Sequence, residues 1–157
     1  MDVKISTKLE AFFTQYKQQT YKKGEILVRA GDEPQGVFYL KKGVVRQYSI
    51  SKDGEEQTFN LYKSTSFFPL MWAVNDTPNT YYFEAVVDVE VYRAPKEQAT
   101  LFLKKEPEVM YDLISRLYRG MHGLLTRIEY LISGDAYAKV IFTLLNTSYR
   151  FGEQKQK

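Results

Sequence analysis

The stretch that decides the fold runs from Lys23 to Arg46 and reads KGEILVRAGDEPQGVFYLKKGVVR. Short apolar runs alternate in it with glycine turns, which lie at Lys23-Gly24, Gly31-Asp32 and Lys42-Gly43. The clearest apolar run is Phe38-Tyr39-Leu40, and Val44-Val45 follows the third turn. Many short strands separated by turns at regular intervals indicate a β-sandwich or a jelly roll.

The strand pattern continues from Arg46 to about Tyr92. Asp53-Gly54 stands between two strand-like runs and predicts a tight hairpin, because glycine accepts a positive φ without a Cβ penalty. The cleanest alternation begins at Phe83 and ends at Val91, where every second residue is apolar. This period of two predicts a single half-buried strand over that run.

Regions on both sides of the strands have the period of a helix. Near the N-terminus, Thr7-x-x-Glu10 has the form of a capping box and predicts that a short amphipathic helix opens there. After Ala94-Pro95 a short helix is expected, and Pro107 is expected to open a long one. Gly134-Asp135 breaks that helix, and its aspartate is suited to cap a final helix.

Composition excludes several classes of protein. The chain has 157 residues, of which 44% are hydrophobic and 26% are charged, and its formal net charge is +3. This balance predicts one ordinary globular domain with a real core. The chain has no cysteine, which excludes a disulfide framework, an iron–sulfur cluster and a thiol redox switch. No apolar run approaches the ~20 residues that a membrane-spanning helix needs, so we expect a soluble, cytoplasmic protein without a membrane partner.

An apolar heptad runs through the expected long helix. Its members are Met110, Ile114, Leu117, Met121, Leu124, Ile128 and Leu131. Isoleucine at the a positions with leucine at the d positions favours a parallel two-stranded coiled coil. We therefore predict that these seven residues form a homodimer interface. The alternative is that the same apolar face is buried inside one monomer.

The glycine signature and the heptad together resemble the sensor half of the Crp/Fnr family of bacterial transcription regulators. The residues that carry the resemblance are Lys23-Gly24-Glu25-x-Leu27, Gly31-Asp32, Phe38-Tyr39-Leu40 and Gly43-Val44-Val45-Arg46, and it covers roughly residues 5–152. It implies a mainly β protein with flanking helices. The fold would be a cyclic-nucleotide-binding-like β-roll, a double-stranded β-helix or jelly roll, followed by a long dimerisation helix.

The resemblance also implies a division of the chain by function. Residues 1–106 would form the β-roll effector domain with its N-terminal helix, and residues 107–134 would form the dimerisation helix. Residues 135–157 would be the first helix of a DNA-binding domain that is truncated or absent. The expected function is therefore effector sensing and dimerisation in a DNA-binding regulator, with DNA bound only through a helix-turn-helix that this chain does not contain.

In that family a Phe-Gly-Glu stretch and an Arg-Ser/Thr-Ala stretch grip the cyclic phosphate. By the resemblance, the Gly-Glu positions fall on Phe68 and Pro69, and the arginine falls on Asn79; Thr80 keeps the hydroxyl. Proline removes an N–H donor, phenylalanine blocks close approach, and asparagine supplies no positive charge. By the same resemblance, the hydroxyl residues that would contact the base fall on Leu124 and Leu125. We therefore predict that the protein does not respond to cAMP or cGMP.

The remaining ligand site is a degenerate pocket whose effector the sequence does not identify. Its candidate residues are Phe67, Phe68, Pro69, Leu70, Trp72, Asn79, Thr80, Tyr81, Tyr82, Leu124 and Leu125. The aromatic members either line an apolar pocket or fill the cavity themselves.

Enzymatic function is not expected. His122 is the only histidine, whereas a metal cupin needs two or three with a carboxylate, and neither a nucleophile motif nor a P-loop is present. We therefore predict no catalytic residues, no metal and no cofactor. The alternative to a regulator's sensor domain is a stand-alone β-roll module that binds a small apolar metabolite or a protein partner.

Overall fold

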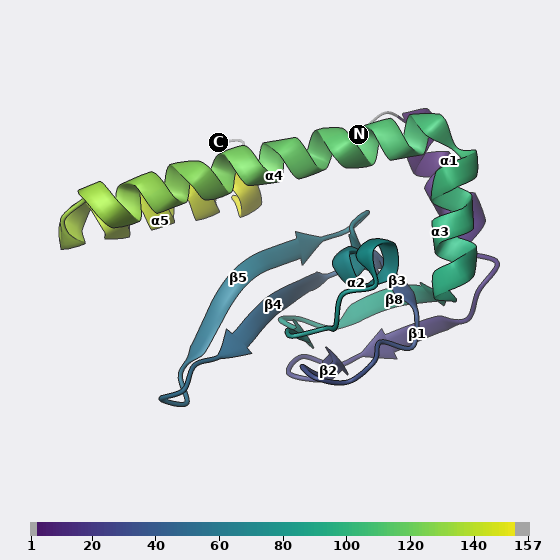
Figure 1. Cartoon of the computed structure of the whole chain (residues 1–157), viewed down its shortest axis with the longest axis horizontal. Coiled ribbons are helices and arrows are strands. Elements are labelled where there is room, and N and C mark those ends of the chain that lie inside the picture. Colours follow the sequence, from purple (N-terminus) through teal and green to yellow (C-terminus); the bar gives the residue numbers. More distant parts are fainter. Residues whose placement is uncertain (1–2, 153–157) are drawn as a thin grey trace, which may run out of the picture. The chain divides into compact units, whose positions relative to one another are not determined.

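The structure is a computed structural model and describes residues 3–152, apart from the side chains of residues 131, 133, 146 and 149–151. The chain forms two compact units, one up to Met110 and the other from Tyr111. The helices are α1 (Val3–Phe13), α2 (Leu70–Asn75), α3 (Lys96–Lys105), α4 (Pro107–Ser133) and α5 (Ala136–Phe151) (Figure 1). The strands are β1 (Gln18–Tyr21), β2 (Ile26–Val28), β3 (Val37–Lys42), β4 (Val44–Ile50), β5 (Glu56–Lys63), β6 (Phe67–Phe68), β7 (Tyr82–Ala85) and β8 (Val89–Ala94).

The strands form two antiparallel sheets of four strands each. One sheet has the order β1-β8-β3-β6 and the other the order β2-β7-β4-β5. Strands distant in the sequence pair within each sheet, as Gln18 of β1 does with Tyr92 of β8. Only the β4–β5 pair in the second sheet is a simple hairpin, closed by the predicted turn at Asp53-Gly54. The prediction of a mainly β roll with flanking helices is confirmed.

The core of the roll lies between the two sheets. Each sheet contributes apolar side chains at alternate positions, as the pleat requires. The buried cluster comprises Val28, Val45, Phe83 and Ala85 from the second sheet, and Phe38, Leu40, Phe68, Val89 and Val91 from the first. Three half-buried tyrosines, Tyr21, Tyr62 and Tyr81, pack against this cluster.

The predicted single strand from Phe83 to Val91 is wrong, because the chain turns there. β7 ends at Ala85 and pairs with β2 and β4, whereas β8 begins at Val89 and pairs with β1 and β3 in the other sheet. At the corner the Asp88 carboxylate accepts hydrogen bonds from the backbone N–H of Lys23 and from Nζ of Lys22. Both strands face the same interior, so the apolar alternation continues through a corner that it does not reveal.

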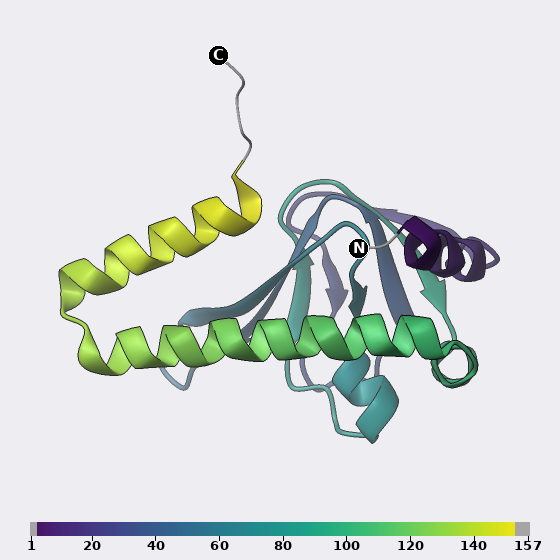
Figure 2. The same cartoon turned by 90° about the horizontal axis from the view of Figure 1, so that it is seen from above.

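Most helix boundaries follow the predicted caps. Pro107 opens α4, and the Asp135 carboxylate accepts a hydrogen bond from the backbone N–H of Ala138 at 2.8 Å, which caps α5 as expected. Within the second unit, Figure 2 shows α4 and α5 joined by a sharp turn. The Tyr130 and Phe142 rings stack across that turn with their centroids 4.2 Å apart.

The N-terminal helix begins earlier than the capping box predicts. α1 begins at Val3, and the Thr7 hydroxyl lies inside it, donating to the Val3 carbonyl at 2.9 Å. A threonine can satisfy its hydroxyl in this way within a helix, so the motif does not mark a start here. The helix packs through Phe13 on Tyr39, where the ring centroids are 5.0 Å apart.

Gly43 closes the tight link between β3 and β4. Its φ is +98°, and a Cβ at this position would meet the Asp88 carbonyl oxygen and the Val89 Cγ1 atom at 2.7 Å each. Gly54 in the hairpin also has a positive φ, of +84°, but a Cβ there would meet nothing within 4 Å. Alanine at Gly54 would therefore suffer backbone strain alone, whereas alanine at Gly43 would suffer both backbone strain and steric overlap.

Gly43→Ala should destabilise the roll more than Gly54→Ala. The left-handed backbone alone costs an alanine roughly 1–2 kcal/mol, which we expect for Gly54→Ala, and the overlap at the β7–β8 corner should at least double that loss at Gly43. Urea unfolding followed by tryptophan fluorescence gives both free energies. Equal losses in the two variants would contradict the close approach of Gly43 to the corner.

Candidate functional site

The tract that the sequence analysis singled out crosses the end of the roll. β6 ends at Phe68, a cis peptide bond joins Phe68 to Pro69, and α2 follows from Leu70. Pro69 is buried at the N-cap of α2 and has no backbone N–H to donate. Pro69 therefore cannot donate a backbone hydrogen bond to an anion at the start of α2.

The Phe68 side chain occupies the interior of the roll and is fully buried. Its ring stacks on Phe83 with centroids 5.1 Å apart and an interplanar angle of 6°, and on Phe38 at 5.7 Å. Tyr62 approaches the same ring at 5.1 Å. Phe38 belongs to the sheet of Phe68, whereas Phe83 and Tyr62 belong to the other. The ring therefore joins the two sheets.

The Asn79 side chain is only 7% exposed and serves the loop that carries it. Its Nδ2 atom donates to the carbonyl oxygens of Arg29 at 2.8 Å and Tyr81 at 2.9 Å. Its Oδ1 atom accepts a hydrogen bond from the backbone N–H of Tyr81 at 3.3 Å. Both N–H groups of the amide are thus used within the protein, and the side chain carries no charge.

The other aromatic and hydroxyl residues of the tract point in several directions. Tyr81 packs against the core and meets Phe59 edge-on at 5.5 Å, whereas Thr80 is exposed. Tyr82 alternates with the buried Phe83 and stacks on Tyr48 at 5.1 Å on the outward face of the sheet.

Residues on both sides of Pro69 in the sequence lie near the helices that flank the roll. The Trp72 ring is buried, with the Lys96 ammonium 4.8 Å from its centroid, and Leu70 is half-buried. Phe67 lies 6.3 Å from Phe13 of α1, measured between ring centroids. The predicted pocket residues of the first unit thus divide between the roll interior, its outer face and its helix layer.

The outward face near Tyr82 carries a network of charges that is satisfied internally. Arg46 bonds the Glu84 carboxylate at 2.8 Å and the Glu56 carboxylate at 2.6 Å, and its guanidinium lies 4.2 Å from the centroid of the Tyr48 ring. The hydrogen bond to Glu84 raises the pKa of Arg46, and burial raises the pKa of Tyr48. The Nη2 group of this arginine is used in ion pairs within the sheet.

The predicted interface residues lie on α4, and most are exposed in this chain. Ile114, Leu117, Met121, Leu124 and Ile128 are 42–60% exposed, and Met110 is half-buried. Leu125, which also belongs to the predicted pocket, is 61% exposed. Leu124 and Leu125 of the predicted pocket thus belong to the second unit, whereas Leu70 belongs to the first. The Leu131 side chain lies outside the described residues.

The described part of the chain shows neither a metal site nor a membrane-spanning helix. No three His, Cys, Asp or Glu side chains among these residues are grouped so that they could hold a metal ion, and His122 lies exposed on α4. None of the helices described is both long and apolar enough to cross a bilayer. The expectation of no metal and no cofactor stays a prediction.

The family model for the "Cyclic nucleotide-binding domain" matches residues 18–106, which is more than half of the chain. The chain belongs to this family. Among curated proteins it is similar to the global nitrogen regulator of Nostoc, with 27% identity over 136 residues, which are 85% of this chain and 61% of the relative. It is also similar to the fumarate and nitrate reduction regulatory protein of Vibrio cholerae, with 23% identity over 140 residues, which are 88% of this chain and 55% of the relative.

Solved structures of the family share the fold. The c-di-GMP-responsive global regulator CLP of Xanthomonas campestris superposes with a TM-score of 0.82 at 16% identity, covering 96% of this chain and 76% of that one. The catabolite activator protein of Thermus thermophilus gives a TM-score of 0.66 at 20% identity, covering 80% and 59%. The resemblance to Crp/Fnr regulators is confirmed. The chain spans little more than half the length of the two curated relatives described above.

Phe68→Ala should cost about 3–5 kcal/mol of the free energy of unfolding, because it leaves a cavity where the two sheets meet. Phe59→Ala is the matched control: Phe59 is 49% exposed and touches Tyr81 only by its edge, so we expect a loss below ~1 kcal/mol. Thermal and urea unfolding of both variants measure the difference. Similar small losses would mean that Phe68 does not hold the sheets together.

Proposed function

We propose that this chain is the effector-sensing and dimerisation part of a Crp/Fnr-type transcription regulator. The carrying observation is that a roll of the cyclic nucleotide-binding family leads directly into a 27-residue helix with an exposed apolar seam. The relatives with similar sequences are named as regulators and not as enzymes, which supports a role without catalysis. A stand-alone module that binds an apolar metabolite is not favoured by these relatives.

The proposed division of labour follows the chain. Residues 1–106 form the effector domain, 107–134 the dimerisation helix, and 135–157 include the first helix of the DNA-binding part. Binding of an effector would bias the arrangement of the paired α4 helices and so the spacing of the DNA-reading elements. In this proposal, DNA is bound by a helix-turn-helix outside these residues. The regulator would act in the cytoplasm.

The proposed regulator does not use cAMP or cGMP as its effector. A cyclic phosphate needs a cation and free N–H donors, and the tract offers Phe68, Pro69 and Asn79 in their place. The Phe68 ring fills the interior, Pro69 has no N–H, and the N–H groups of Asn79 bond to backbone carbonyls. These three observations support loss of the phosphate clamp.

The proposed partner is a second copy of the chain. Seam residues such as Leu117 and Leu124 leave more than half of their side-chain surface in water, although each contributes roughly 1.5–3 kcal/mol when fully buried. A parallel pairing of two α4 helices covers these side chains and places equivalent residues opposite each other across the two-fold axis. We therefore propose the seven heptad residues as the interface.

Titration calorimetry with cAMP or cGMP at millimolar concentration should give no saturable heat. The physical reason is the missing positive charge at Asn79 together with the occupied interior at Phe68. Saturable heat with one nucleotide per chain would show that the tract still binds the cyclic phosphate and would overturn this part of the proposal.

Met121→Glu should dissociate the proposed dimer. The introduced carboxylate would face its own symmetry mate in mid-seam, which adds repulsion to desolvation. Arg119→Glu is the matched control: it also introduces a glutamate, but two residues away on the same helix and outside the seam. Sedimentation velocity should report a monomer for the first variant and a dimer for the second.

Circular dichroism completes the dimer experiment by showing whether the Met121→Glu chain keeps its helices. Met121→Glu could lose its helix signal together with the dimer. An intermolecular seam is then still supported if dilution of the unmutated chain also causes loss of the helix signal. An unchanged dimer for Met121→Glu would mean that the seam packs elsewhere.

The 157 residues should not shift duplex DNA at physiological salt. With a net charge of only +3, counter-ion release supplies little affinity. An electrophoretic shift assay with random-sequence and operator-like duplexes checks this. A sequence-specific shift would show that the DNA-reading element lies within these residues.

A further inference from the structure

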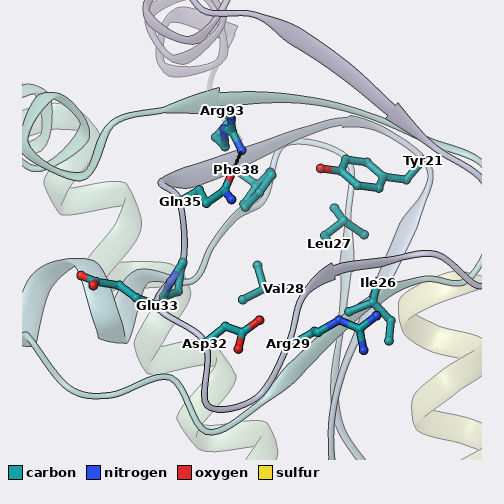
Figure 3. Close-up of a pocket in the computed structure, with 11 residues that line it drawn as sticks. Tyr21, Ile26, Leu27, Val28, Arg29, Asp32, Glu33, Gln35, Phe38 and Arg93 are labelled. Atoms are coloured by element: carbon teal, nitrogen blue, oxygen red, sulfur yellow. Dashed lines mark hydrogen bonds between the residues drawn. The ribbon is translucent and has the colours of Figure 1, made fainter.

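A cavity of about 240 Å³ lies at another place in the roll, where β2 and the loop after it pass the β1 and β8 strands of the other sheet (Figure 3). The residues around it come from β1, β2, β3 and β8 and from the loop between Arg29 and Gln35. None of them belongs to the tract of residues 67–82. The cavity is therefore separate from the phosphate-binding position of the family, and it lies wholly within the first unit.

The inner wall of the cavity is apolar. Phe38 and Val28 belong to the buried core of the roll, and Leu27 is packed against that core. Figure 3 shows these three side chains between the polar groups of the rim. A ligand that enters the cavity would therefore lay an apolar group against this wall.

One side of the rim carries a positive charge held in place by a neighbour. The Arg93 guanidinium donates from Nη1 to the Gln35 side-chain oxygen at 2.5 Å, beside Phe38 in Figure 3. A guanidinium has five N–H donors, so this single bond leaves others for an anion, ideally a carboxylate bound by two of them. Burial raises the pKa of the neighbouring Tyr21, and the positive charge of Arg93 acts against that rise.

The opposite side of the rim carries a negative charge. In Figure 3 the Asp32 carboxylate points towards the cavity from the loop, whereas the nearby Glu33 carboxylate points away. No hydrogen bond or ion pair to the Asp32 carboxylate is found within the described residues. The Arg93 guanidinium and the Asp32 carboxylate thus lie on opposite sides of the cavity with an apolar wall between them, and Arg29 lines the cavity beside Asp32.

This pattern selects among ligands by charge. A simple anion would meet Arg93 but also the Asp32 carboxylate, and a simple cation would meet the reverse combination. The four charged residues at the rim, Arg29, Arg93, Asp32 and Glu33, sum to zero. A molecule that carries both signs satisfies both sides, so a zwitterion fits the site better than either ion.

The volume limits the size of that zwitterion. At about 240 Å³, the cavity is smaller than the ~300 Å³ at which sites for drug-sized ligands begin. A free amino acid has this size. Its charged groups share one carbon atom, and its side chain projects from the same carbon.

We propose that this cavity binds a free α-amino acid with an apolar side chain. The carboxylate binds the Arg93 guanidinium, the ammonium group binds the Asp32 carboxylate, and the side chain lies against Phe38, Leu27 and Val28. This ligand class goes beyond the proposed function and does not rest on it, because binding of an amino acid to the isolated chain requires neither dimerisation nor DNA binding.

Calorimetry with leucine and phenylalanine tests the proposal on the full chain. One of the two should bind with one site per chain. Two analogues of leucine each remove one charge: 4-methylpentanoate lacks the ammonium group and 3-methylbutylamine lacks the carboxylate. Each should bind at least tenfold more weakly than leucine. Absence of binding by both amino acids at millimolar concentration overturns the proposal, as does equal binding of either analogue.

Variants locate the binding in this cavity. Arg93→Gln and Asp32→Asn should each weaken amino-acid binding at least tenfold, whereas Asp53→Asn, an equivalent charge removal in the exposed β4–β5 hairpin, should leave it unchanged. Arg93→Lys should recover part of the affinity if charge is what matters. Binding that none of the cavity variants changes lies elsewhere and overturns the assignment, and urea unfolding of each variant confirms that it is folded.

Discussion

The roll depends on the stacking of Phe68 between its two sheets. Sheet faces pack only when side chains from both sides interdigitate, and this ring touches Phe38 on its own sheet and Phe83 on the other. Aromatic pairs of this kind contribute roughly 0.5–1.5 kcal/mol beyond the burial of their area. By the resemblance to the family, Phe68 also lies at the start of the tract that we propose to correspond to the phosphate-binding stretch. In this chain the Phe68 side chain is fully buried in the interior of the roll.

The loops beside Phe68 are also held together by contacts within the protein. Asn79, which the resemblance places at the position of the family's arginine, donates a hydrogen bond to the Arg29 carbonyl and so ties its loop to the loop after β2. The backbone N–H of Gly31 donates in turn to the Asn79 carbonyl at 2.9 Å, so two loops are held together. The second of these loops forms one side of the cavity flanked by Arg93 and Asp32. Asn79 thus helps to hold the loop that forms one wall of this cavity.

The sequence predicted those features that depend on local chemistry. Glycine turns, proline and aspartate at helix starts and the apolar period of α4 act within a few residues, so the strand-rich roll and its flanking helices could be read directly. The corner between Ala85 and Val89 could not, because both strands alternate towards the same interior. Arg93 and Asp32 gave no signal, since only the sheet topology brings β8 beside the loop after β2.

The central claim is that stacked aromatic rings close the interior of the roll between its two sheets. A double-mutant cycle with Phe68→Leu and Phe83→Leu tests it most directly, because the coupling free energy reports contact between the two rings alone. The account predicts that the two losses of unfolding free energy are non-additive by about 1 kcal/mol. Losses that add to within ~0.3 kcal/mol would show that the rings do not touch in solution, and would contradict the claim that this interior is closed.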